Sequence, residues 1–233
     1  MENRTASVAT AWASSIARLG GGLSVAKSLG PRPAKLLELY EFEACPFCRK
    51  VRETLSFLDL EALVYPCPKG GTRYRARAEA LGGKAQFPFL VDPNTSRQMY
   101  ESSEIITYLA NTYGTGKRPL MVSLGPVTML SSGLASAFRT GRGGKLRASK
   151  LPSRPLELWS FEASPYCRLV RERLCELELP YQLHNVGHRS PSRPAFVARS
   201  GKQMVPWLFD PNTDQGMFES SQILAYLDQN YAG

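Results

Sequence analysis

The chain of 233 residues contains few cysteines and histidines, and no uninterrupted apolar run of the length that a membrane span needs. The stretch 119–138 comes closest, but Ser, Thr, Gly and Pro interrupt it, so we expect no transmembrane helix. The cysteines are odd in number and lack regularly spaced pairs, which argues against the disulfide framework of a secreted protein and favours a reducing compartment. They are Cys45, Cys48, Cys67, Cys167 and Cys175. Only His184 and His188, far from the Cys45–Cys48 pair in sequence, could complete a zinc site, so we predict no metal.

Acidic residues are absent from 105–156, which holds eight Lys and Arg, and 1–37 holds five basic residues against one Glu. The net charge of +9 is therefore concentrated in two segments. A basic, Ser-bearing N-terminus is typical of a transit peptide, but a similar segment recurs inside the chain. We therefore expect 1–35 and 115–154 to be basic helical segments, each packed beside its domain.

The alternative for the basic segments is contact with an anionic membrane surface or an acidic protein through 115–154, because positive charge on a partly apolar stretch favours such an interface. The protein would then be peripherally associated with a membrane rather than freely soluble. The basic stretches lack a regular interleaving of aromatic residues, so we expect no nucleic-acid binding.

The chain contains the same unit twice. The segment 36–60 matches 155–179 at 15 of 25 positions, and the two copies lie about 119 residues apart. That spacing is too long for a solenoid repeat and predicts two domains, 36–114 and 155–233. The copies differ at the first residue of one motif, which reads Cys-Pro-Phe-Cys in the first copy and Ser-Pro-Tyr-Cys in the second.

Hydrophobic periodicity predicts the element order β-α-β-α-β-β-α in each copy. In the first copy the expected elements are 37–42, 46–60, 62–65, 73–81, 89–92, 98–100 and 103–113; in the second they are 156–161, 165–179, 181–185, 193–200, 207–210, 217–218 and 221–231. A parallel start with an antiparallel finish gives a four-stranded mixed sheet flanked by helices in each domain. The fold class is therefore α/β.

Cys45 lies where the first predicted strand ends and the following helix begins. Unpaired N–H groups and the positive end of the helix dipole stabilise a thiolate at that position. Cys48 lies one turn further along, placed to attack a mixed disulfide on Cys45, and Arg49 adds positive charge beside the motif. We predict that Cys45 attacks and Cys48 resolves in dithiol exchange, which requires a Cys45 sulfur that solvent can reach.

The second copy has Ser164 in place of the attacking thiol and keeps Cys167 at the inner position. A hydroxyl there can donate a hydrogen bond to a bound thiolate, which suits activation of a thiol ligand better than disulfide exchange. Ser164 and Cys167 are therefore candidate ligand-binding residues. The alternative is that this copy is a structural or binding relic.

The combination of a strand, Cys-Pro-Phe-Cys, a helix, Gln86-Phe87-Pro88-Phe89 and Tyr100-Glu101-Ser102-Ser103 resembles the thioredoxin-fold module shared by glutaredoxins and the N-terminal domain of glutathione S-transferases. The chain as a whole is similar to plastid proteins of plants and algae that carry two such modules in tandem. The resemblance implies glutathione as a cosubstrate and the chloroplast as the location.

The resemblance also assigns roles to residues in both copies. A cis-proline would expose the backbone of the residue before it to the peptide backbone of glutathione. A Glu-Ser pair would hold the γ-glutamyl group, its carboxylate resting on a helix N-terminus. Alone, such a pair would more often be an ordinary helix cap. The residues so assigned are Phe87, Pro88, Glu101 and Ser102 in the first copy and Val205, Pro206, Glu219 and Ser220 in the second.

Three functions are open at this point. The first is a glutathione-linked thiol-disulfide oxidoreductase with one redox-competent and one degenerate domain, acting on glutathione and on protein disulfides. In it Cys45 attacks the disulfide, and either Cys48 or glutathione resolves the mixed disulfide. The second is a glutathione-dependent transferase or isomerase, which a deep apolar cavity next to Cys45 would favour and a solid interface between the copies would oppose. The third is a non-catalytic module that binds glutathione, a protein or a membrane surface.

Overall fold

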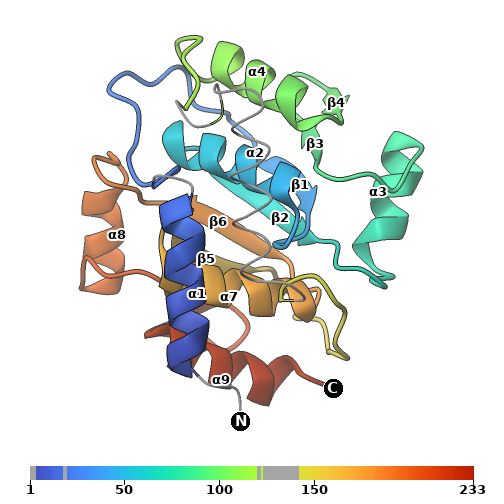
Figure 1. Cartoon of the computed structure of the whole chain (residues 1–233), viewed down its shortest axis with the longest axis vertical. Coiled ribbons are helices and arrows are strands. Elements are labelled where there is room, and N and C mark those ends of the chain that lie inside the picture. Colours follow the sequence, from blue (N-terminus) through green and yellow to red (C-terminus); the bar gives the residue numbers. More distant parts are fainter. Residues whose placement is uncertain (1–3, 18–19, 120–121, 123–141) are drawn as a thin grey trace.

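The computed structural model describes residues 4–17, 20–119, 122 and 142–233 (Figure 1). Residues 120–121 and 123–141 of the basic segment predicted at 115–154, which include most of the apolar stretch 119–138, lie outside the described residues. The strands are β1 (Leu37–Glu41), β2 (Ala62–Pro66), β3 (Phe89–Asp92), β4 (Arg97–Met99), β5 (Leu156–Ser160), β6 (Tyr181–Asn185), β7 (Trp207–Asp210) and β8 (Gln215–Phe218). The helices are α1 (Arg4–Ala17), α2 (Pro46–Phe57), α3 (Tyr74–Gly82), α4 (Ser102–Thr112), α7 (Pro165–Glu176), α8 (Arg193–Ser200) and α9 (Ser220–Tyr231).

Each copy has the predicted α/β order, with a parallel first strand pair and an antiparallel hairpin at the end. The two sheets join edge to edge because β2 pairs antiparallel with β6, Leu63 opposite Gln182. The result is one eight-stranded sheet in the order β4-β3-β1-β2-β6-β5-β7-β8, with the two copies side by side (Figure 1). The interface between the copies is therefore solid.

Alternation along the strands sends successive side chains to opposite faces of the sheet. On one face Leu37 and Leu39 pack under α2 and α4, and the equivalent strand of the second copy packs under α7 and α9. On the other face aromatic side chains, Tyr40 and Trp159 among them, pack under α3 and α8. The sheet is thus covered on both sides, and the helices that begin at the two motifs, α2 and α7, lie on the same face.

We expected the helix α1 to pack beside the domain that follows it, but it does not. It lies against α7 of the second copy (Figure 1). The chain after it continues along the second copy, where the N–H of Val25 donates to the carbonyl of His188 at 2.9 Å. The segment before the second copy likewise contacts the first copy, where the N–H of Lys69 donates to the carbonyl of Gly144 at 2.7 Å. Each segment therefore contacts the other copy, which sequence similarity between the segments could not reveal.

Within the described residues, none of the helices has both the length and the apolar character required to cross a bilayer.

Candidate functional site

Cys45 is the N-cap of α2, with extended backbone angles, and Pro46 follows it at the first helical position. The backbone N–H of Cys48 donates to Cys45 Sγ at 3.3 Å. A hydrogen bond from the Cys48 thiol and the N–H groups of Cys48 and Phe47 outweigh burial and lower the pKa of Cys45 to about 7. Cys45 is thus substantially ionised at neutral pH, as an attacking thiol must be.

Cys48 has the opposite character. It is fully buried, and burial, together with the interaction with Cys45, raises its pKa well above the usual value. A low-pKa sulfur at the cap and a protonated sulfur one turn inside form the arrangement in which the outer sulfur attacks and the inner one resolves.

Access to Cys45 is narrower than we expected. The residue is 4% exposed, although the adjacent Phe47 is 41% exposed. The loop at Gly143 lies against the motif, where its carbonyl accepts a bond from the N–H of Ala44 at 3.4 Å. Cys45 is therefore buried under this loop, and none of the cavities described for the protein is lined by it.

Positive charge beside the motif comes from Arg52 as well as from Arg49. Arg49 is buried between the copies, and burial together with the nearby Arg168 lowers its pKa to about 9. Among the nearby charges, it is Arg52 that helps to lower the pKa of Cys45. Arg49 remains charged at neutral pH, but its helical position alone did not reveal that its face is the interface between the copies.

The residues assigned to glutathione in the first copy have the backbone features that the resemblance implied. The Phe87–Pro88 bond is cis, as is Val205–Pro206 in the second copy. Glu101 has a positive φ of 62° and its side chain does not cap α4. An ordinary cap would use its side chain on the helix N–H groups, so the simple capping alternative does not describe this residue.

The same conformation recurs in the second copy, where Glu219 has a φ of 65° and does not cap α9. Positive φ at a residue other than glycine is strained, and such strain is found preferentially at ligand sites. Ser102 and Ser220, which follow these glutamates, are buried at the helix N-termini.

Ser164 takes the place of Cys45 with the same geometry. It caps α7, and its Oγ accepts from the N–H of Cys167 at 3.3 Å. The Ser164 side chain also hydrogen-bonds the side chain of Cys167 and is 5% exposed. Cys167 is fully buried, and burial raises its pKa.

An apolar cavity of about 410 Å³ opens next to Ser164, not next to Cys45. Val205 also lines it, so two of the residues assigned to the second copy meet there. Its walls include Trp12, Ile16, Leu23 and Tyr166, which are among the few large apolar side chains that the protein exposes. The helix α1 supplies Trp12 and Ile16, so the segment that crosses over from the N-terminus builds part of this cavity.

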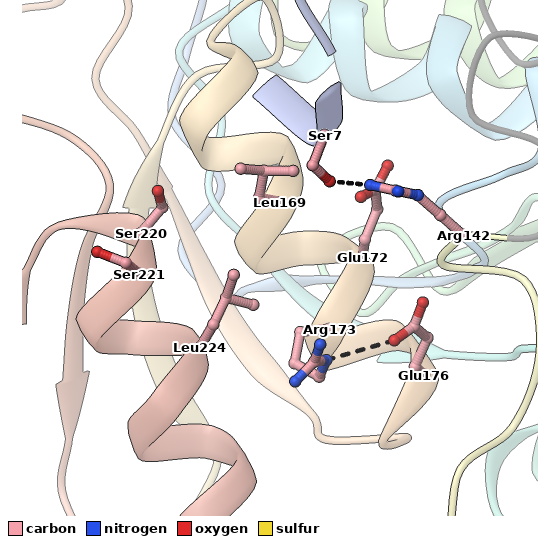
Figure 2. A pocket seen from close by; sticks show the side chains of 9 residues that line it. All are labelled: Ser7, Arg142, Leu169, Glu172, Arg173, Glu176, Ser220, Ser221 and Leu224. Atoms are coloured by element: carbon pink, nitrogen blue, oxygen red, sulfur yellow. Dashed lines mark hydrogen bonds and ion pairs between the residues drawn. The ribbon is translucent and has the colours of Figure 1, made fainter. Parts of the chain in front are cut away.

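Ser220 lines a second cavity, of about 220 Å³. Figure 2 shows Ser220 and Ser221 at the start of α9; Leu224, one turn further along, points towards α7, which carries Leu169 and Arg173. On the far wall Arg142 reaches Ser7 of α1. The structure therefore does not bring Ser220 into the same cavity as Ser164.

Sequence reasoning missed a cluster of buried charges between the copies. Arg52 pairs with Glu41 and Glu43 of its own copy and, at 3.0 Å, with Glu162 of the other. Arg171 of the second copy pairs with Glu43 and Glu162 at 3.1 and 2.9 Å. The sequence did contain a signal for this cluster, because most of its charged residues occur at the same positions in both copies. A charged residue on a helix is nevertheless expected at the surface unless its partners are known.

No group of three or more His, Cys, Asp and Glu residues that could hold a metal ion occurs within 4–17, 20–119, 122 and 142–233.

Comparison with known proteins identifies relatives of both copies. The chain is 36% identical over 58 residues to the glutathione S-transferase-like protein tpcF of Aspergillus fumigatus, a match that covers 25% of this chain and 26% of the relative. It is 31% identical over 77 residues to the glutathione S-transferase-like protein gedE of Aspergillus terreus, which covers 33% and 34%. The matches thus span about a quarter to a third of these relatives.

Among solved structures, the trimeric glutathione transferase TDR1 of Leishmania matches with a TM-score of 0.29 and 14% identity, over 84% of this chain and 67% of that one. The profile of the "Glutathione S-transferase, N-terminal domain" family matches residues 39–118 and again residues 158–233. These two matches together cover more than half of the chain, which therefore belongs to the family of the glutathione S-transferase N-terminal domain.

Proposed function

We propose that the protein is a glutathione-linked thiol-disulfide oxidoreductase that works through Cys45 and Cys48. The observation that carries the proposal is the division of the pair into a thiol with a pKa of about 7 at the helix cap and a buried thiol with a raised pKa. The second copy, with Ser164 at the cap, lacks the attacking sulfur and is the degenerate partner.

In the proposed reaction the Cys45 thiolate attacks one sulfur of a disulfide and releases the other as a thiolate. Cys48 then loses its proton, attacks Cys45 Sγ and releases the second thiolate, leaving a Cys45–Cys48 disulfide. Two molecules of glutathione reduce that disulfide and become glutathione disulfide, so two electrons pass from glutathione to the substrate. We assign the backbone of Phe87 and the Glu101–Ser102 pair to binding of the tripeptide.

Because Cys45 is 4% exposed, the proposed reaction requires the loop at Gly143 to move away from the motif, and a small disulfide needs a smaller movement than a folded protein does. Protein disulfides, a plastid location and contact of 115–154 with a membrane surface or an acidic protein stay predictions.

The test is reduction of a small disulfide coupled to glutathione, with Cys45→Ser and Cys48→Ser compared with the wild type. Serine keeps an oxygen acceptor at the helix cap, so Cys45→Ser preserves the fold while removing the nucleophile. We expect Cys45→Ser to abolish turnover. Cys48→Ser should retain the first attack, and any turnover that it keeps should then depend on glutathione to resolve the mixed disulfide on Cys45. Full activity of Cys45→Ser would refute the proposal, and no turnover in the wild type would favour the non-catalytic binding module.

The solid interface between the copies and the position of the apolar cavity, which is not next to Cys45, oppose a transferase site at Cys45. A second candidate function is nevertheless supported by an observation in the second copy. The apolar cavity beside Ser164 suits a glutathione-dependent transferase or isomerase, in which the Ser164 hydroxyl donates to the glutathione thiolate and the cavity holds an apolar cosubstrate. Conjugation of an apolar aryl electrophile with Ser164→Ala and Cys45→Ser separates the two candidates. Loss of conjugation in Ser164→Ala alone would support the transferase, and equal activity of the two variants would oppose it.

A further inference from the structure

The segment 142–149, here named the strap, runs between the two copies and passes beside the motif of the first. The N–H of Ala44 donates to the carbonyl of Gly143 at 3.4 Å. A Cβ added at Gly144 would lie only 3.3 Å from the Cβ of Ala44. The strap therefore lies directly against the residue that precedes Cys45, a thiol with an exposed fraction of 4%.

Gly143 approaches both copies so closely that a side chain does not fit there. Its φ is 62°, a conformation that glycine adopts without strain. A Cβ at this position would lie 2.9 Å from the Cβ of Glu43 in the first copy and 3.0 Å from Cγ of Glu172 in α7 of the second. The strap is thus seated between the copies, and its seating depends on glycine at this residue.

Glu176, the last residue of α7, anchors the strap to the second copy. Its Oε1 accepts from the N–H of Gly143 at 2.9 Å, and its backbone carbonyl accepts from the N–H of Arg147 at 2.7 Å. Arg173 Nε donates to the other carboxylate oxygen at 3.3 Å and orients the group (Figure 2). A hydrogen bond to a charged acceptor is stronger than one between neutral groups, so the carboxylate is the main side-chain anchor of the strap.

The segment before the first copy passes the second motif in the same way and supplies a comparison. Gly22 of this segment has a φ of 78°, and a Cβ there would lie 2.7 Å from the Cβ of Glu162. Phe57 occupies the position of Glu176 in the repeat. The carbonyl of Phe57 accepts from the N–H of Ala26 at 2.8 Å, so the backbone anchor is present in both copies.

The two segments differ in the side chain that anchors them. The ring of Phe57 offers no oxygen to a backbone N–H, whereas Glu176 adds a carboxylate. The cavity of about 410 Å³ opens beside Ser164, and the segment before the first copy forms part of its wall. None of the cavities described above is lined by Cys45. The carboxylate anchor therefore occurs at the motif that has the attacking thiol, and that motif is the closed one.

We propose that Glu176 holds the strap closed over Cys45, so that the second copy controls which molecules reach the thiol of the first. The inference rests on the proposed oxidoreductase and gives the degenerate copy a role in it. Opening breaks the bonds of Gly143 to Ala44 and to Glu176, while the cores of both copies stay folded. The reaction rate at Cys45 is then proportional to the open fraction, which a weaker anchor increases. Glu176 acts through the strap and is a positioning residue.

The first test measures the rate at which iodoacetamide alkylates Cys45 in the native reduced protein at one fixed pH. Glu176→Ala removes the carboxylate anchor. Asp228→Ala is the matched control, because Asp228 pairs at 3.4 Å with the side chain of Arg147, which is 44% exposed and contributes little. We expect Glu176→Ala to react roughly 10-fold faster than the wild type and Asp228→Ala less than about 3-fold faster. Equal rates in the wild type and Glu176→Ala would overturn the proposal.

The dependence of this rate on urea separates opening of the strap from unfolding of the protein. Opening of the strap exposes little surface, so in low urea the rate at Cys45 should rise less steeply than the unfolded fraction measured by tryptophan fluorescence. The acceleration in Glu176→Ala should persist at zero urea and exceed any change in the unfolded fraction. A rate at Cys45 that follows global unfolding in both proteins would contradict the opening of a strap.

A second pair of variants tests the seating of the strap from the other side. Gly143→Ala places a Cβ against Glu43 and Glu172, so the strap cannot close fully. Gly22→Ala introduces the same kind of strain at the second motif and is the matched control. Alkylation of Cys45 should accelerate in Gly143→Ala and stay at the wild-type rate in Gly22→Ala. The same acceleration in both variants would mean that general loosening, not the strap, exposes the thiol.

Reduction of a small disulfide coupled to glutathione distinguishes this inference from the proposed function. We expect Glu176→Ala to turn over faster than the wild type, in parallel with the faster alkylation of Cys45. Faster alkylation without turnover in either protein would refute the oxidoreductase while leaving the strap in place. Turnover in the wild type, with neither turnover nor alkylation changed in Glu176→Ala, would refute the role of Glu176 alone.

Discussion

Replacing Arg52 with methionine tests the buried charge cluster that joins the copies. The side chain of Arg52 is 1% exposed and pairs with three carboxylates, those of Glu41, Glu43 and Glu162, the last at 3.0 Å. Methionine fills a similar length of space without charge, so the substitution removes the ion pairs while leaving most of the packing. The three carboxylates would then share only the remaining arginines of the interface.

The expected cost follows from the burial of the partners. Removing one member of a buried ion pair typically destabilises a protein by about 3–5 kcal/mol, because it leaves a charge in the interior without compensation. Arg52 pairs with three carboxylates, so we expect the loss in the free energy of unfolding to lie in the upper half of that range at neutral pH. Protonation of Glu41, whose pKa is already about 7, limits the cost.

The assay is urea unfolding followed by fluorescence of Trp159 and Trp207, which lie in the core of the second copy. Arg77→Met is the matched control, since Arg77 pairs with Glu38 at 3.4 Å while its own side chain is 46% exposed. Solvent screening limits that exposed pair to about 1 kcal/mol or less. If the two variants differed by less than about 1 kcal/mol, the cluster would contribute little to joining the copies.

Three further predictions concern other parts of the molecule. Ser164→Ala should lower the free energy of unfolding by about 1 kcal/mol through loss of the α7 cap, whereas Cys45→Ser should cost less; equal losses in urea melts would show that the cap is not the cause. Burial opposes ionisation of Glu162, but its arginine partners lower its pKa to about 2, so its contribution of about 3 kcal/mol should be present above pH 4.5 and lost as pH falls towards 2. Acid unfolding curves of the wild type and Glu162→Gln should therefore diverge above pH 2, and parallel curves would contradict the assignment. Ile16→Asp should weaken binding of an apolar fluorescent probe to the cavity beside Ser164 without unfolding α1, because Ile16 is exposed; unchanged binding would place the probe elsewhere.

The sequence was sufficient for the parts of the fold that depend on local patterns. The repeat predicted two modules, and alternation and helical spacing located their strands and helices to within a few residues; α2, for example, ends at Phe57 rather than at residue 60. The helix-cap position of Cys45 also followed from the strand-to-helix transition. These features depend on neighbours in sequence, which explains why they could be predicted.

The pairing of β2 with β6 could not be predicted, because an edge strand has no sequence feature that names its partner. The contact of α1 with the second copy could not be predicted for a related reason. Similar segments precede both copies, and their sequences do not indicate which copy each segment contacts. The burial of the arginines could not be predicted either, because only the joined sheet brings α2 and α7 to a common interface. The burial of Arg49 between the copies was consequently not foreseen, nor was the cavity beside Ser164.

The most direct test of a reactive Cys45 is alkylation of the native reduced protein by a small haloacetamide as a function of pH, with the modified residues identified by mass spectrometry. Cys45 should be modified first, with a midpoint near pH 7, while the buried Cys48 reacts more slowly. In Cys48→Ala, which lacks the thiol that donates to Cys45, the midpoint should move upward. A Cys45 that reacts only after denaturation, or with a midpoint near 9, would contradict the proposal that this sulfur is the nucleophile.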